Sequence, residues 1–133
     1  MAANLRGTET ILVVEDDASL RRMAAEALQL FGFRVLQAPS GEDALTVLEQ
    51  ANGGVDLLLT DIVMPHMSGR ELARQLAGRR PNLKIIFMSG YAEQAAVRNG
   101  LLDPNQAFIS KPFTPEALVR KLRSVLDGAD APN

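Results

Sequence analysis

Side chains that could carry out chemistry stand at the ends of apolar runs in this sequence. Glu15 and Asp16 follow one β-branched run directly, and Asp61 closes another. Ser89 and Lys111 stand in corresponding places after two later runs. Carboxylates held close together repel one another and favour a bound cation at neutral pH. Oxygen ligands without imidazole or thiolate favour a hard ion, so the expected metal is Mg²⁺ rather than Zn²⁺.

This set of groups suits phosphoryl transfer. A lysine amine and a hydroxyl beside a magnesium-binding carboxylate would neutralise the oxygens of a phosphoryl group. The chain has no Gly-rich nucleotide loop and no separate base, so a carboxylate is the expected nucleophile. Each residue alone has a simpler interpretation: Asp17 as a helix cap, Asp61 or Ser89 as a turn residue, and Lys111 as a solvated side chain. Their shared position at strand ends favours one site.

Five apolar runs alternate with helical patterns, and these elements must position the reactive groups. The expected strands are 11–14, 33–38, 57–59, 83–88 and 107–109. The expected helices are 20–31, 40–51, 68–80, 92–98 and 114–126. Strict alternation with continuously apolar strands predicts an α/β fold, with a parallel sheet and helices on both faces. Right-handed crossovers make that sheet doubly wound, with ligands bound beyond the carboxyl ends of its strands.

Composition excludes several other classes of protein. The 133 residues fit one domain, expected over 10–127 with flexible termini at 1–9 and 128–133. The absence of cysteine excludes disulfides and thiolate zinc sites, and one histidine cannot build a His-rich metal site. A net charge of −2 disfavours direct nucleic-acid binding. No apolar stretch approaches the ~20 residues of a membrane span, so a cytoplasmic location is expected.

Four stretches of the chain resemble the receiver domain of two-component response regulators. The similarity runs from Ile11 to about Leu126, and the matching stretches are Ile11–Asp16, Asp61–Gly69, Phe87–Tyr91 and Phe108–Phe113. The resemblance implies a flavodoxin-like sheet with strand order 2-1-3-4-5. The serine-glycine-tyrosine run at 89–91 is also similar to receivers attached to hybrid sensor histidine kinases.

The same resemblance implies a role for each residue of the site. Asp61 would accept a phosphoryl group from a phosphohistidine on a histidine kinase or a histidine phosphotransfer protein. The implied Mg²⁺ ligands are Asp16 directly, Glu15 through water, Asp61, and the backbone carbonyl of Val63. Ser89 would sense the phosphoryl group and Lys111 would pair with it. Phe108 would act with Ser89 as a switch that changes the surface of the fourth helix, fifth strand and fifth helix. The peptide bond before Pro112 would be cis.

Three residues depart from the commoner pattern of the family. Glu15 replaces an aspartate and extends its carboxylate by one methylene, which suits a contact through water. Ser89 replaces a threonine and keeps the hydroxyl. Phe108 replaces a switch tyrosine, so it can change burial but cannot form a hydrogen bond.

Two alternative functions compete with this phosphorylatable switch, which would not be a turnover enzyme. A flavodoxin-like cofactor carrier needs a phosphate-binding loop after the first strand, where Glu15, Asp16 and Asp17 have the wrong charge. A non-phosphorylated pseudo-receiver would act only as an interaction module. The complete set of site residues argues against it. The downstream partner is not encoded in any recognisable motif.

Overall fold

The computed structural model describes residues 5–90 and 106–128 of the chain. Its strands are β1 (Thr10–Val14), β2 (Arg34–Ala38), β3 (Leu57–Asp61), β4 (Lys84–Ser89) and β5 (Ala107–Ser110). Its helices are α1 (Ala18–Leu30), α2 (Gly41–Gln50), α3 (Gly69–Ala77) and α5 (Pro115–Leu126). The helix expected over 92–98 lies outside the described residues.

The five strands form one parallel sheet in the order β2-β1-β3-β4-β5. This confirms the expected doubly wound topology and its strand order. The order of strands reverses direction between β1 and β3, where a doubly wound sheet opens a crevice at the carboxyl ends. Because β1 and β3 are paired neighbours, the residues that follow them emerge side by side.

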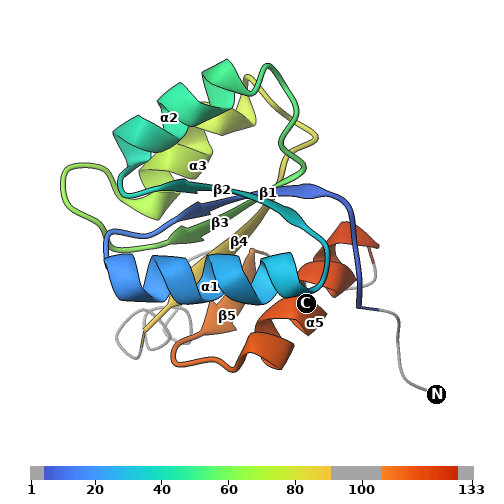
Figure 1. Ribbon diagram of the computed structural model, residues 1–133. Coiled ribbons are helices and arrows are strands. Elements are labelled where there is room, and N and C mark those ends of the chain that lie inside the picture. The colour runs from blue at the N-terminus through green and yellow to red at the C-terminus, as the bar shows by residue number, and fades with distance from the viewer. Residues whose placement is uncertain (1–4, 91–105, 129–133) are drawn as a thin grey trace.

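Helices cover both faces of the sheet, as Figure 1 shows. Alternation along the buried strands explains this, since successive side chains point to opposite faces. On one face Ile11 and Val13 of β1 pack in a cluster with α1 and α5. On the other face Leu12 and Val14 pack with α2 and α3. Both faces of the sheet are therefore buried from water. The acidic residues of the site lie at the strand ends instead.

Side-chain caps start each of the described helices at the residue that the sequence indicates. Asp17 accepts from the backbone N–H groups of Ser19 and Leu20 at the start of α1. The hydroxyls that cap the other three helices are those of Ser40, Ser68 and Thr114. A cap satisfies backbone donors that have no partner inside the helix, so it fixes where the helix begins. The β1–α1 connection is consequently only three residues long.

The chain before β1 is packed rather than free over the residues that the structure describes. Gly7 N–H donates to the carbonyl of Phe31 at 3.0 Å, and Arg34 N–H donates to that of Glu9. Leu5 packs against the core beneath α1 and α5. Residues 5–9 therefore include packing contacts with the domain expected over 10–127.

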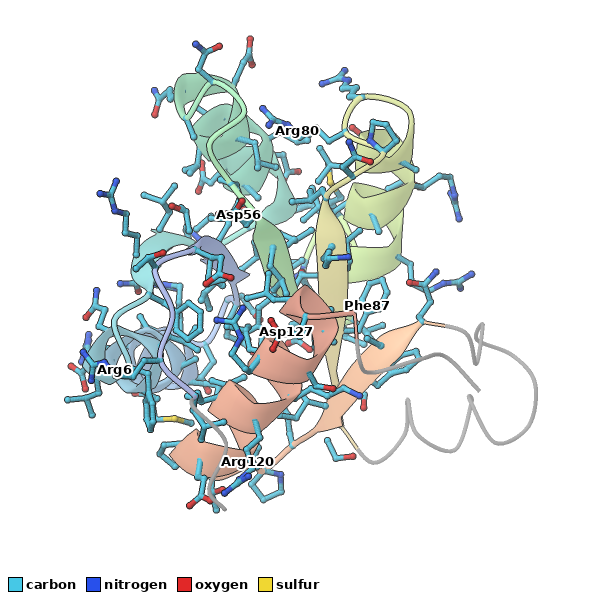
Figure 2. All side chains as sticks on the ribbon, turned by 90° about the vertical axis from the view of Figure 1, so that its right-hand side faces the viewer. Arg6, Asp56, Arg80, Phe87, Arg120 and Asp127 are labelled. Carbon is cyan, nitrogen blue, oxygen red and sulfur yellow. The ribbon has the colours of Figure 1, made fainter. Side chains whose placement is uncertain are left out.

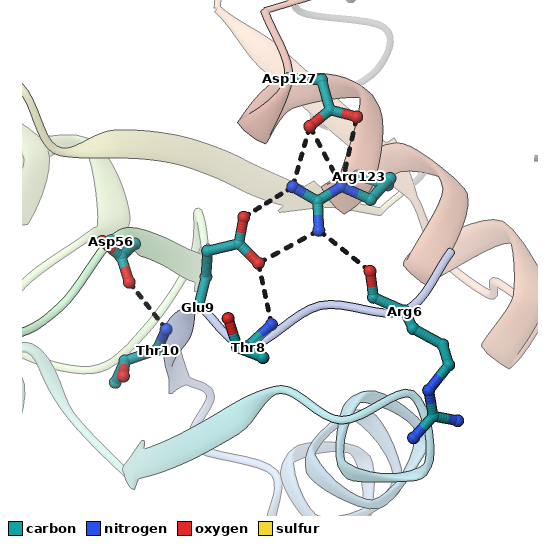
Figure 3. Close-up of polar contacts among 7 residues, drawn as sticks. All are labelled: Arg6, Thr8, Glu9, Thr10, Asp56, Arg123 and Asp127. Atoms are coloured by element: carbon teal, nitrogen blue, oxygen red, sulfur yellow. Dashed lines mark hydrogen bonds and ion pairs between the residues drawn. The ribbon is translucent and has the colours of Figure 1, made fainter. Parts of the chain in front are cut away.

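A network of polar contacts lies at the edge where the strands begin. This edge is here called the amino edge and is defined by Glu9, Asp56, Arg123 and Asp127. Figure 2 looks onto this edge of the sheet, and Figure 3 shows its contacts. The Arg123 guanidinium donates to both carboxylate oxygens of Glu9, at 3.1 and 2.6 Å, and to Asp127. Asp56 accepts from the N–H of Thr10 at 2.8 Å. No helix of the described part has the length and apolarity that crossing a membrane requires.

Candidate functional site

Three carboxylates meet where the strands end, and this edge is here called the carboxyl edge. Oxygens of Glu15, Asp16 and Asp61 all lie within 4.8 Å of one another. Glu15 is 1% exposed and Asp61 is 5% exposed, whereas Asp16 is exposed. The sequence places these groups at the ends of separate strands, and the fold brings them together as expected.

The end of β3 is shaped by a close backbone approach. Gly69, the first residue of α3, lies so near the Asp61 carbonyl that a Cβ at Gly69 would overlap it. The Gly69 N–H donates to the carbonyl of Ile62 at 2.8 Å, which closes the loop that follows the acid. Only glycine permits this approach. Gly69 therefore holds the loop after Asp61 tightly against the strand.

Lys111 reaches into the acidic cluster from the end of β5. Its Nζ lies 3.0 Å from Oδ2 of Asp61 and 3.3 Å from Oε1 of Glu15. Its backbone N–H donates to the carbonyl of Ser89 at 2.8 Å, which ties it to the end of β4. The Lys111–Pro112 peptide bond is cis, the isomer that the resemblance implies. One amine thus faces two carboxylates.

The protonation of this site reflects burial and crowding of like charges. Burial is the main cause that raises the pKa of Glu15 to about 7, and the carboxyls of Asp16 and Asp61 raise it further. The N–H of Asp17, which donates to Glu15 at 3.0 Å, and the Lys111 amine act in the opposite direction. Burial alone would lower the pKa of Lys111, but its ion pairs with Asp61 and Glu15 outweigh burial and raise it. The single amine of Lys111 therefore does not balance the negative charge of the three carboxylates.

One oxygen of the cluster is left without a bond. Oδ1 of Asp61 is buried and finds no hydrogen-bond partner among the described residues. A buried polar atom without a partner carries the full cost of its desolvation, of about 1–3 kcal/mol. Such an orphaned oxygen beside two more carboxylates fits a hard divalent cation or an incoming electrophile. The donor set therefore fits Mg²⁺.

The remaining expected site residues lie around this cluster. Ser89 closes β4 and is buried, and β4 is the neighbour of β3 in the sheet. Phe108 lies in β5, opposite Phe87 of β4, and their ring centroids are 5.6 Å apart. Both rings line a cavity of about 300 Å³ beside α3. Val63 is 61% exposed in the loop after Asp61.

An arginine that the sequence analysis did not single out also contacts this edge. Arg21 of α1 donates from Nη1 to the backbone carbonyl of Glu15 at 2.6 Å. The signal available in the sequence was its spacing, one helical turn after the acidic loop, with the adjacent Arg22 equally eligible. Spacing alone could not tell which of the two arginines turns back toward the loop.

A family model for the response regulator receiver domain matches residues 11–123. The chain belongs to this family. The match spans β1 through most of α5, so it includes every element that contributes to the acidic cluster. The fold expected for a receiver and the parallel order of its strands agree with the observed topology.

Two curated relatives show the settings in which similar receivers occur. The chain is 40% identical to the sensor kinase CckA of Brucella abortus (strain 2308) over 129 residues, which cover 97% of the chain and 14% of the kinase. It is 38% identical to the response regulator receiver protein CpdR of the same organism over 119 residues, covering 90% of the chain and 98% of CpdR. The chain thus corresponds to a small part of one relative and to nearly all of the other.

Solved receiver structures superpose on the chain over most of its length. The receiver domain from the hybrid histidine kinase CckA matches with a TM-score of 0.72 and 30% identity, covering 88% of this chain and 98% of that one. A response regulator receiver protein from Sinorhizobium medicae WSM419 matches with a TM-score of 0.78 and 29% identity, covering 92% and 98%. The chain is therefore similar both to the receiver of a hybrid kinase and to a response regulator receiver protein.

Proposed function

We propose that this receiver is a phosphoryl-accepting switch whose acceptor is Asp61. The observation that carries the proposal is the buried Oδ1 of Asp61, which has no hydrogen-bond partner among the described residues although Oδ2 is paired with Lys111. One oxygen is held, and the other is available as a nucleophile. The donor is a phosphohistidine on a histidine kinase or a histidine phosphotransfer protein, and the location is cytoplasmic.

The reaction forms one bond and breaks another. A carboxylate oxygen of Asp61 attacks phosphorus, the bond between phosphorus and the donor histidine nitrogen breaks, and its electron pair stays on that imidazole. Lys111, whose amine lies 3.0 Å from Oδ2 of Asp61, would pair with the new phosphoryl oxygens. The Ser89 hydroxyl, buried at the end of β4, would donate to another.

The residues that would hold Mg²⁺ are Glu15, Asp16, Asp61 and the carbonyl of Val63. The cation would neutralise charge on the phosphoryl oxygens as the group is transferred. This chain supplies a crowded set of carboxylates, in which burial first and the neighbouring carboxyls of Asp16 and Asp61 second raise the pKa of Glu15.

The response to phosphorylation involves β5 and α5. Movement of Ser89 toward the phosphoryl group would free space that the Phe108 ring can fill, so two packings of this region compete. Phe108 is half-buried against Phe87 beside a cavity, which gives the ring room to move. The switch acts through a changed surface rather than through repeated turnover.

Intact mass after incubation with acetyl phosphate and Mg²⁺ tests the proposal. We expect one added phosphoryl group, which is absent without Mg²⁺ and absent in Asp61→Asn. Asp56→Asn is the matched control, because it removes a carboxylate just before the opposite end of the same strand and should still be phosphorylated. An unmodified wild-type protein would favour the pseudo-receiver, which acts as an interaction module only.

A further inference from the structure

We propose that Arg21 is a positioning residue that holds Asp16 in place for the divalent cation. This inference rests on the proposed function, since it takes the carboxyl edge to be the cation site. It assigns a role to a side chain of α1 that lies outside the acidic cluster itself.

Arg21 bonds to the backbone on both sides of Asp16. Its guanidinium Nη1 donates to the carbonyl of Glu15 at 2.6 Å, and its backbone N–H donates to the carbonyl of Asp17 at 2.9 Å. These two carbonyls belong to the residues immediately before and after Asp16. The second bond is the first backbone bond of α1, which any residue at position 21 would form, so only the Nη1 bond is specific to the arginine side chain. That bond holds the backbone directly before Asp16.

Asp16 needs such support more than the other two acids do. Glu15 and Asp61 are buried, and Asp61 is part of β3. Asp16 is exposed and belongs to the short β1–α1 connection, which is not part of any strand. Repulsion from two nearby carboxylates favours rotation of an exposed carboxylate away from them. The bond from Nη1 of Arg21 to the Glu15 carbonyl opposes that movement by holding the backbone before Asp16.

Geometry and charge predict opposite effects of removing Arg21. The guanidinium is positive, so charge alone would repel a cation, and loss of Arg21 would then strengthen Mg²⁺ binding. If positioning dominates, loss of Arg21 weakens binding, because groups that orient metal ligands typically account for about 10–100-fold in affinity. The direction of the change therefore separates the two effects.

The experiment is calorimetric titration of the metal-free protein with Mg²⁺ at constant ionic strength. Arg21→Ala and Arg21→Met both remove the guanidinium, and the methionine keeps an aliphatic stem that protects the fold. We expect each to weaken Mg²⁺ binding about tenfold. Arg21→Lys keeps one donor and should recover part of that loss. Arg22→Ala removes an exposed charge from the same turn and should change the affinity by less than about twofold.

Each outcome separates this inference from the function on which it rests. If wild-type protein fails to bind Mg²⁺, the proposed cation site itself is wrong. If wild type binds and the Arg21 variants bind as tightly or more tightly, Arg21 is not a positioning residue. Arg123→Ala removes an arginine at the amino edge and controls for general destabilisation. An equal loss of Mg²⁺ affinity in that variant would also overturn the inference.

Discussion

The two edges of the sheet treat carboxylates in opposite ways. At the amino edge the Glu9 carboxylate receives both bonds of one guanidinium, and its hydrogen bond with Arg123 lowers its pKa. At the carboxyl edge Lys111 faces both Glu15 and Asp61, and the pKa of Glu15 rises to about 7. The first edge stabilises its charges, whereas the second leaves them incompletely compensated.

The difference indicates at which edge a further cation would lower the energy of the carboxylates. A carboxylate with well-matched partners gains nothing from a further cation, and the Arg123 network also ties the chain before β1 to α5 (Figure 3). Carboxylates that repel one another store unfavourable energy that a cation can relieve. The amino edge therefore contributes to stability, whereas the crowded carboxylates of the carboxyl edge lower it.

The largest expected effect is a pH dependence that originates at Glu15. Its folded pKa of about 7 lies above the ordinary 4.5, so the folded state keeps a proton that the unfolded state has lost between these values. The free energy of unfolding should therefore fall as the pH rises from about 4.5 to about 7, by on the order of 3 kcal/mol. Glu15→Gln should flatten this part of the profile.

Urea unfolding in EDTA at a series of pH values measures this slope. Glu26→Gln removes an exposed carboxylate from α1 and controls for the loss of one negative charge. If Glu15→Gln and wild type lose stability in parallel over this range, Glu15 is not the group responsible.

The second-largest expected effect is a gain in stability when Asp61, the proposed phosphoryl acceptor, is replaced. Asp61→Asn relieves repulsion in the acidic cluster and should raise the free energy of unfolding by about 1–2 kcal/mol without metal. Millimolar Mg²⁺ should narrow the difference, because only the wild type keeps the full ligand set and gains stability from binding. Thermal unfolding with and without Mg²⁺ provides the comparison. A less stable Asp61→Asn protein in EDTA would contradict the contrast between the edges.

At the amino edge, removing a charged side chain should lower the free energy of unfolding instead of raising it. Arg123→Met removes the donor that bridges Glu9 and Asp127 and should lower the free energy of unfolding by about 1–2 kcal/mol. Arg120→Met is the matched control, since Arg120 forms an exposed pair with Glu116 on the same helix and should change stability by at most about 0.5 kcal/mol. Chemical denaturation of the two variants and the wild type measures both changes in the free energy of unfolding. Equal effects of the two substitutions would show that Arg123 acts as an ordinary surface residue.

Much of this architecture follows from local sequence patterns. The apolar runs predict all five strands within a few residues, and the caps at Asp17, Ser40 and Thr114 mark helix starts that the structure confirms. The carboxyl edge was also predictable, because parallel strands place their carboxyl ends together. Reactive side chains at the ends of apolar runs therefore indicate the position of a site from the sequence alone.

Contacts between residues that are far apart in the sequence could not be predicted from such local patterns. Arg123 and Glu9 are 114 residues apart, and nothing in either neighbourhood indicates their bond. The choice of Arg21 over Arg22 depends on rotation of α1 against the sheet, which the short-range pattern does not resolve. The closeness of Gly69 to the Asp61 carbonyl is likewise a property of packing between α3 and β3.

The smallest expected effect separates charge from hydrogen bonding within the amino edge. Glu9→Gln keeps an oxygen that can accept from Arg123 but removes the negative charge, so we expect a loss of about 0.5 kcal/mol at pH 7. The pKa of Glu9 is lowered below 4.5, so its contribution is present above that value and is lost as the pH falls through the folded pKa. The two proteins should therefore converge in strong acid. The negative charge of Glu9 adds stability as the pH rises, whereas ionisation of Glu15 removes stability. Urea unfolding at a series of pH values from 7 into strong acid tests this, and a difference that stays constant over the whole series would assign the contact to packing rather than to charge.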